Sequence, residues 1–354
     1  MREFFVRKTI LSSVMSILLA SVPACLLAQA PMAASSATQA GALTITKVPL
    51  PGEGRGDYLV ADSAANRLFV THSRVVHVLD LKTLKPIAEV GGLTAAHGVA
   101  IDAKGRAFVT DGDSNSVIQF DPANGRVLKR IAVGKKPDSI LFDPASQKIM
   151  AFDGDSEEVS VIEPSTGAVV TTIKLPNGPE FSQTDGRGHV YVNLEEGNAI
   201  AVINTAKMTL DHLIPLTGCD GPAPLALDNA NRRLFSGCGN KVMVVTDADS
   251  GKVIASVPVG GDPDGIVYDA GTKRIFVGNR DGTWTIVSQA SPDQYRVEQT
   301  LKIDEYAKTL ALDPETHRVF SSTADLVWPP AVPGKKHLPN AKPGTFRLLV
   351  VNQL

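Results

Sequence analysis

The segment LVADSAANRLFV, residues 59–70, decides the fold because the chain repeats its pattern six more times. In each copy an apolar strand ends in an aspartate, a short turn follows, and a second apolar strand begins. The aspartates that mark the copies, here called the repeat aspartates, are Asp62, Asp102, Asp143, Asp185, Asp228, Asp269 and Asp313. They lie 40, 41, 42, 43, 41 and 44 residues apart. A period of this length is typical of propellers in which each repeat forms one small sheet.

Each pair of strands is followed by a third apolar segment, such as SVIQF at 116–120, and after a turn by a fourth, such as VIASVPV at 253–259. Four such segments predict an antiparallel meander. One meander cannot bury both of its faces, whereas a closed ring of them can. We therefore predict an all-β protein, a seven-bladed β-propeller with four-stranded antiparallel blades. The seventh copy has its third strand at 347–351, so we expect the N-terminal strand at 43–50 to close the last blade.

Composition excludes several other classes of protein. The 354 residues are 43% hydrophobic and 20% charged, with 30 Gly and 23 Pro, which fits a packed chain rich in turns and excludes collagen, coiled coils and long disorder. The formal net charge of −2 means that bulk charge does not recruit nucleic acid. Walker A, HExxH and G-x-S-x-G motifs are absent, so nucleotide hydrolysis, zincin proteolysis and α/β-hydrolase chemistry are unsupported.

Residues 1–40 have the pattern of a signal peptide with a short leader, which leaves 41–354 for the propeller. Basic residues precede an apolar stretch at 10–27, and small residues follow. This predicts export to the periplasm or secretion, with no transmembrane span. Cys25 offers an alternative, a lipid anchor, although Pro23 departs from the usual lipobox.

Short motifs in the repeats resemble those of the YVTN-repeat propellers and, within them, the exported YncE-like proteins. The tetrapeptide occurs in altered form as Phe69-Val70-Thr71-His72, Phe108-Val109-Thr110-Asp111 and Phe276-Val277-Gly278-Asn279. The companion G-x-x-P segment occurs as Gly134-Lys135-Lys136-Pro137. The resemblance covers residues 43–354 and implies the propeller fold. It also implies single-stranded DNA binding as one possible function.

Loops that enter the innermost strands and loops that join the second and third strands share one side of a propeller, here called the top face. The residue five positions before each repeat aspartate is expected at the mouth of the central channel. These mouth residues are Asp57, His97, Asp138, Glu180, Ala223, Asp264 and Lys308. The other top-face loops add polar residues that include His72 and Asn193. We predict a ligand-binding site formed by Asp57, His72, His97, Asp138, Glu180, Asn193, Asp264 and Lys308.

Carboxylates gathered at one mouth raise one another's pKa values or recruit a cation. Candidate ligands for Ca²⁺, Mg²⁺ or Zn²⁺ are Asp57, Asp138, Glu180 and Asp264. His97 and Glu180 are candidate catalytic bases. The alternative is that these polar side chains are simply solvated.

On the opposite, bottom face a basic residue follows each repeat aspartate across its turn. These residues are Arg67, Arg106, Lys148, Arg187, Arg233, Arg274 and Arg318. They form either a ring that attracts phosphate or seven local pairs with the repeat aspartates. Because aromatic residues make up only 5% of the chain, stacking platforms for bases are scarce and we favour the local pairs.

Two further features lie on the top face. Cys219 and Cys238 flank the first two strands of the fifth copy and are expected to form a disulfide. Residues 326–346 form an insertion with Trp328 and a basic cluster at 335–337, which we interpret as either a lid or partner contact, or a surface loop.

Three functions follow from these observations. The first is a non-catalytic exported propeller that binds a ligand, a cation or a protein partner at an acidic mouth. The second is a metal-dependent lactonase or lyase, in which an ion at the mouth polarises a carbonyl and His97 or Glu180 moves the proton. The third, implied by the family resemblance alone, is single-stranded DNA binding.

Overall fold

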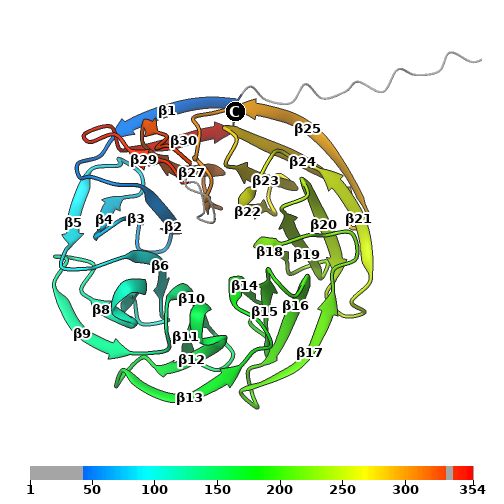
Figure 1. Cartoon of the computed structure of the whole chain (residues 1–354), viewed down its shortest axis with the longest axis horizontal. Coiled ribbons are helices and arrows are strands. Elements are labelled where there is room, and N and C mark those ends of the chain that lie inside the picture. The colour runs from blue at the N-terminus through cyan, green and yellow to red at the C-terminus, as the bar shows by residue number, and fades with distance from the viewer. Residues whose placement is uncertain (1–42, 332–337, 354) are drawn as a thin grey trace, which may run out of the picture. The chain divides into compact units, whose positions relative to one another are not determined.

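The seven sequence repeats form seven four-stranded antiparallel sheets arranged as blades around a common axis (Figure 1). The structure is a computed structural model, and it describes residues 43–331 and 338–353. The predicted seven-bladed propeller is therefore confirmed. The signal peptide, Cys25 and the basic cluster at 335–337 lie outside the described residues.

The first four blades follow the order of the sequence, from the innermost to the outermost strand. Blade 1 contains β2 (Gly56–Asp62), β3 (Arg67–His72), β4 (Val75–Asp80) and β5 (Pro86–Val90). Blade 2 contains β6 (Ala96–Ile101), β7 (Ala107–Asp111), β8 (Ser116–Phe120) and β9 (Val127–Ala132). Blade 3 contains β10 (Pro137–Asp143), β11 (Lys148–Asp153), β12 (Glu158–Glu163) and β13 (Ala168–Lys174). Blade 4 contains β14 (Pro179–Thr184), β15 (His189–Leu194), β16 (Ala199–Asn204) and β17 (Thr209–Pro215).

The next two blades continue this order. Blade 5 contains β18 (Pro222–Asp228), β19 (Arg233–Cys238), β20 (Val242–Asp247) and β21 (Val253–Pro258). Blade 6 contains β22 (Pro263–Asp269), β23 (Arg274–Asn279), β24 (Thr283–Ser291) and β25 (Gln294–Lys302).

The last blade joins the two ends of the described chain. Its strands are β26 (Ala311–Asp313), β27 (Arg318–Thr323), β30 (Arg347–Gln353) and β1 (Leu43–Pro49). β1 pairs antiparallel with β30, from Leu43 opposite Gln353 to Pro49 opposite Arg347. The predicted closure by the N-terminal strand is confirmed, and it ties the ring together with backbone hydrogen bonds.

The hydrophobic core consists of seven clusters, each between two neighbouring blades. In one of them Phe69 and Val78 of blade 1 pack against Val109 and Phe120 of blade 2. The cluster that closes the ring places Leu59 of blade 1 with other apolar side chains of blade 7. Because each blade buries both faces against neighbours, the ring is one cooperative core that fixes the innermost strands.

The repeat aspartates have a local structural role on the bottom face. Each accepts hydrogen bonds from backbone N–H groups two to four residues further along, as Asp102 does from Lys104 and Arg106 at 2.9 Å. Most also bind a side chain of an adjacent blade, as Asp143 accepts from Thr184 and Asp313 from Ser63. The aspartate accepts hydrogen bonds from backbone N–H groups of its own turn. Because each hairpin has the same N–H groups, the aspartate recurs in every blade.

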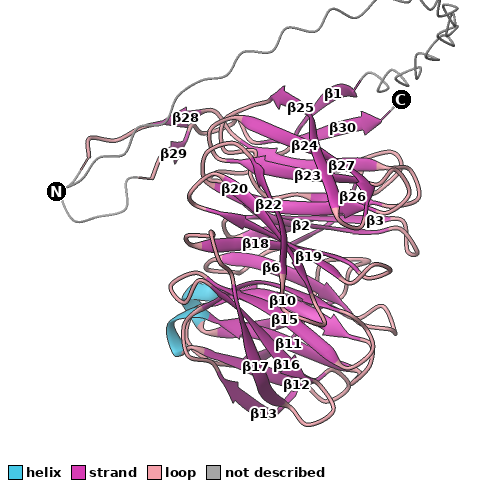
Figure 2. Ribbon diagram, turned by 90° about the vertical axis from the view of Figure 1, so that its right-hand side faces the viewer, coloured by secondary structure: helices cyan, strands magenta, loops and turns pink. Residues whose placement is uncertain are grey.

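Two short helices and a small hairpin mark the top face. Helix η1 (Gly112–Ser114) and helix η2 (Gly154–Ser156) occupy loops between second and third strands. They lie on the same side of the ring as β28 (Leu326–Val327) and β29 (Asn340–Ala341), which pair within the predicted insertion (Figure 2). The predicted disulfide joins Cys219 to Cys238 and is confirmed. Among the described residues, every helix is too short to cross a bilayer.

Candidate functional site at the top-face mouth

Six of the seven mouth residues sit in irregular positions of the innermost strands. The pairing of β2 with β3 is interrupted between Gly56 and Leu59, which places Asp57 inside the irregularity. The same shift surrounds His97 in β6 and Asp138 in β10. Glu180, Ala223 and Asp264 occupy equivalent places in β14, β18 and β22. A bulge changes the direction of the side chain that it contains. These residues therefore do not follow the regular alternation of side chains between the two faces of their strands.

Five mouth residues form one network of alternating charge. His97 Nδ1 lies 2.7 Å from Asp57 Oδ2 and 3.1 Å from Asp138 Oδ1. Lys308 Nζ lies 3.3 Å from Asp57 Oδ1 and 2.5 Å from Asp264 Oδ2. Arg280 Nη2 extends the network with a 2.9 Å contact to Asp264. Residues of blades 1, 2, 3, 6 and 7 are thereby joined across the mouth.

The network shifts the pKa values of Asp57, His97 and Lys308 in the directions that keep these three groups charged. Burial opposes ionisation of Asp57, but Lys308 and His97 outweigh it and lower the pKa of the Asp57 carboxyl. Burial also disfavours the imidazolium of His97, yet the hydrogen bond to Asp57 and the charge of Asp138 raise its pKa to about 9. His97 is therefore protonated at pH 7. The pKa of Lys308 is likewise raised, since Asp264 and Asp57 outweigh the effect of its burial.

Asp138 is the exception in this network. Burial and the nearby charge of Asp57 raise its pKa to about 6, against the opposing influence of His97. The Tyr58 hydroxyl donates to Asp138 Oδ2 at 3.3 Å, and burial together with this carboxylate raises the pKa of Tyr58. Asp138 is thus the member whose charge is most easily changed near neutral pH.

A cavity of about 330 Å³ opens beside the network. Its polar lining includes Arg55, Asp57, His97, Arg280 and Lys308, and its apolar lining includes residues at 95–96 and Leu338 of the insertion. The ring of Tyr306 forms another part of the wall, with the guanidinium groups of Arg55 and Arg280 centred 5.8 and 5.9 Å from it. Among the described residues that line this cavity, Asp57 is the only carboxylate.

The acidic part of the top face is elsewhere. A second hollow, of about 400 Å³, is lined by Asp155, Glu157, Glu180, Glu195 and Glu196. The mouth is therefore divided into a cationic cavity near blades 1, 2, 6 and 7 and an acidic hollow near blades 3 and 4. Counting positions in the sequence gave the residues but not the ion pairs that neutralise three of the carboxylates.

Three predicted ligand-binding residues lie outside the network. His72 is buried and stacks on Phe346 with ring centroids 3.6 Å apart, and burial lowers its pKa to about 4. Asn193 is fully buried and donates to the carbonyl oxygens of Ala223 and Pro224. Glu180 lines the acidic hollow. The structure thus brings together Asp57, His97, Asp138, Asp264 and Lys308 of the eight predicted residues.

One group of donor atoms has the composition of a metal site. Single ligand atoms of Asp57, His97 and Asp138 all lie within 4.8 Å of one another. Two carboxylates and an imidazole suit a divalent cation in type. The proton on His97 and the ammonium of Lys308 compete for the same oxygens, so a cation has to displace one or both. Asp264 and Glu180 do not belong to this group.

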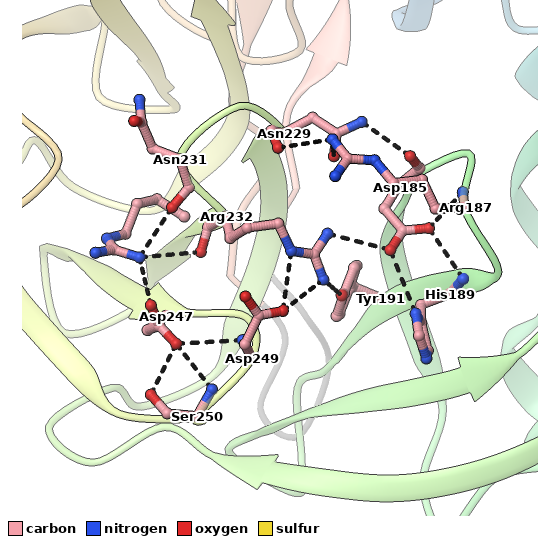
Figure 3. A network of polar contacts seen from close by, with 11 residues as sticks. Asp185, Arg187, His189, Tyr191, Asn229, Asn231, Arg232, Asp247, Asp249 and Ser250 are labelled. Carbon is pink, nitrogen blue, oxygen red and sulfur yellow. Dashed lines mark hydrogen bonds and ion pairs between the residues drawn. The ribbon is translucent and has the colours of Figure 1, made fainter.

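Five of the seven predicted basic residues of the bottom face form ion pairs within the fold. Arg106 and Arg318 contact their own repeat aspartates, at 2.5 and 3.6 Å. Lys148, Arg233 and Arg274 instead pair with acidic residues of other turns and strands, so the predicted pairing with the repeat aspartates is wrong for these three. Figure 3 shows one such network, in which Arg232 binds Asp185, Asp249 and the Tyr191 hydroxyl. Arg187 binds the backbone and side-chain oxygens of Asn229, and Arg67 has no ion pair with a described residue, so the ion pairs occupy five of the seven predicted charges.

Sequence reasoning missed Arg55, Tyr58 and Tyr306 as site residues. All three lie within two positions of a mouth residue, since Arg55 and Tyr58 flank Asp57 and Tyr306 precedes Lys308. A feature of the sequence could have identified them. Each is a bulky residue next to a mouth residue, and a bulky side chain at such a position extends into the mouth. Leu338 gave no such signal, because it reaches the cavity from the insertion.

Comparison with solved structures supports the fold alone. The chain is similar to hydrazine synthase from Kuenenia stuttgartiensis, with 17% identity and a TM-score of 0.66 over 78% of this chain and 94% of that one. It is also similar to the WD40 repeats of RRP9, with 9% identity and a TM-score of 0.74 over 89% and 99% of the two chains. A third match is U3-55K, with 10% identity, a TM-score of 0.72, and coverage of 87% and 98%. No family model and no curated protein matches this sequence.

Proposed function

We propose that this protein is a non-catalytic binding propeller that holds a small ligand in the cavity at its top-face mouth. The observation that carries the proposal is the cavity of about 330 Å³ whose charged wall is fixed by the network of Asp57, His97 and Lys308. Side chains held by ion pairs from several blades are already ordered before a ligand arrives. Preorganisation of this kind reduces the entropy lost on binding.

The test is a thermal-shift screen of a small-molecule library against the wild-type protein and a variant whose cavity is blocked. Ala95→Trp adds an indole at the cavity wall without removing a charged group. Ala123→Trp, at an exposed bottom-face turn, is the matched control. We expect compounds that stabilise the wild type and Ala123→Trp but not Ala95→Trp, since a ligand that binds only the folded state raises its melting temperature. If every stabilising compound also stabilises Ala95→Trp, this cavity is not the binding site.

A second candidate is a metal-dependent lactonase or lyase. The specific observation in its favour is the close approach of ligand atoms from Asp57, His97 and Asp138. A divalent cation held there polarises a substrate carbonyl. In this arrangement His97 is a ligand, so Glu180 is left as the candidate base. Elemental analysis of the purified protein and of Asp138→Asn tests this: a stoichiometric Ca²⁺, Mg²⁺ or Zn²⁺ that is lost in the variant supports the enzyme, and a metal-free wild type after dialysis against each ion contradicts it.

Export to the periplasm or the cell exterior forms part of the proposal. The leader at 1–40 supports it, and so does the Cys219–Cys238 disulfide, because disulfides persist in oxidising compartments. Membership of the YVTN-repeat, YncE-like propellers rests on the quoted tetrapeptides. Fractionation of cells that produce the full chain, with detection of the processed protein, tests the location.

A further inference from the structure

We propose that the ligand of the top-face cavity is a small organic oxyanion, a carboxylate or a phosphate monoester, held by the guanidinium group of Arg55. This inference rests on the proposed function and names the chemical class of its ligand. The guanidinium fork matches both oxyanions, because its parallel N–H donors fit two oxygens at once.

The side chain of Arg55 is the strongest indication. Its guanidinium lies over the Tyr306 ring, 5.8 Å from the centroid, and has no hydrogen bond or ion pair with any other described residue. The residue is half-buried and lines the cavity. The other arginines that line described cavities, Arg106 and Arg280, are paired with aspartates, so among the described cavity arginines Arg55 alone has no acidic partner.

The charge balance of the cavity points the same way. The carboxylates of Asp57, Asp138 and Asp264 are matched by His97, Lys308 and Arg280. These six charges cancel when His97 is protonated, so among the described residues of the network and the cavity wall the charge of Arg55 is in excess. An anion neutralises that charge, whereas a cation adds to the repulsion.

Tyr306 contacts both arginines of the cavity wall. The guanidinium groups of Arg55 and Arg280 lie 5.8 and 5.9 Å from the centroid of its ring, and the ring of Trp328 packs against it edge to face with centroids 5.8 Å apart. Tyr306 and Leu338 also give the cavity an apolar side, which suits an anion carried on an organic group.

Three probes of nearly the same shape but different charge test the inference. Benzoate is the anion, benzamide the neutral analogue and benzamidinium the cation, and phenyl phosphate separates phosphate from carboxylate recognition. Binding to the purified protein is measured by calorimetry and thermal shift at pH 7 and constant ionic strength. We expect benzoate or phenyl phosphate to bind at least about tenfold more tightly than benzamide, which corresponds to one charge-assisted hydrogen bond. Benzamidinium is expected not to bind.

Variants then locate the binding. Arg55→Gln is expected to weaken the oxyanion at least about tenfold, and Arg55→Lys less, because a lysine keeps the charge but loses the fork. Arg126→Gln is the matched control, since Arg126 is an exposed arginine in the bottom-face turn between β8 and β9. It should leave binding unchanged.

The remaining outcomes overturn the inference in distinguishable ways. If benzamidinium binds and benzoate does not, the ligand class is wrong while the cavity remains a binding site. If neither oxyanion binds with dependence on Arg55, the anion site is absent, and the Ala95→Trp screen decides separately whether another ligand occupies the cavity. If a single-stranded oligonucleotide binds through Arg55 much more tightly than phenyl phosphate, the partner is a nucleic acid and not a small molecule.

Discussion

The two faces of this propeller use aspartate for different purposes. On the bottom face the repeat aspartates accept hydrogen bonds from the backbone of their own turns, as Asp185 does from Arg187 and His189. On the top face Asp57 and Asp264 each form an ion pair with a side chain of a neighbouring blade, His97 and Lys308 respectively. The bottom-face pattern recurs in every blade, whereas the mouth position changes from carboxylate to histidine, alanine and lysine around the ring.

The contrast between the two faces distinguishes two classes of residue. The repeat aspartates are required by the fold of each blade, whereas the mouth residues differ from blade to blade and determine the chemistry of the site. Every blade has the same hairpin turn, so replacing its aspartate lowers the stability of that turn. A mouth residue in a bulge is free of that requirement, so its identity reflects what the mouth contains. Variation within an otherwise regular repeat is therefore the better guide to function in this molecule.

The largest expected effect comes from removing a carboxylate from the mouth network. In Asp264→Asn the partly exposed Arg280 loses its carboxylate partner, and the buried Lys308 keeps only its contact with Asp57. We expect a loss of about 3 kcal/mol in the free energy of unfolding, measured with urea, because removing one member of a buried charge network leaves the remaining charges poorly compensated.

The matched change on the bottom face is Asp62→Asn. Asp62 accepts from the backbone N–H of Ala65, and an asparagine oxygen can still accept this bond. We expect a loss below about 1 kcal/mol. Equal losses in the two variants would contradict the distinction between the faces.

Arg232→Gln tests whether bottom-face arginines are structural. Arg232 bridges blade 4 and blade 5 through Asp185, Asp249 and Tyr191, and 18% of its side chain is exposed (Figure 3). We expect a loss of about 2 kcal/mol in unfolding free energy, since several charge-assisted hydrogen bonds are removed at once. Arg232→Lys, which keeps the charge but cannot reach all three partners, should recover only part of it. Full recovery would show that charge alone matters here.

The sequence predicted the fold well and the site in part, for a physical reason. Apolar periodicity and turn residues are local, and they recur seven times, so they specified the blades and the closing strand. Counting from the repeat aspartates also found Asp57, His97 and Lys308, because the ring imposes equivalent positions. Ion pairing depends on distances across blades, which spacing cannot give, so the sequence alone suggested an acidic mouth where the structure has a neutralised one. His72 illustrates the same limit: its position suggested the mouth, but Phe346 covers it.

The stability of the mouth network should depend on pH through His97. Its pKa is raised to about 9 in the folded protein, chiefly by Asp57 and Asp138 against the effect of burial. An ordinary histidine titrates near 6.5, so the folded state binds the proton more tightly than the unfolded state. This stabilisation is complete below pH 6.5 and disappears as pH rises through about 9.

We expect the wild type to lose about 1–2 kcal/mol in unfolding free energy between pH 7 and pH 9.5. His97→Gln keeps a donor towards Asp57 but does not titrate, so its stability should change less over this range. The measurement is chemical unfolding at each pH. A pH dependence that is the same in both proteins would mean that His97 is neutral in the network.

The smallest expected effect sharpens the contrast between arginines on the two faces. Arg55→Gln removes a guanidinium that contacts the Tyr306 ring but forms no ion pair with a described residue. We expect its unfolding free energy without ligand to stay within about 0.5 kcal/mol of the wild type, well below the loss in Arg232→Gln. An arginine that is ordered at a cavity yet contributes little to folding is retained for what it binds. If Arg55→Gln instead destabilises the protein as much as Arg232→Gln, Arg55 is a structural residue and the difference between the two faces does not extend to their arginines.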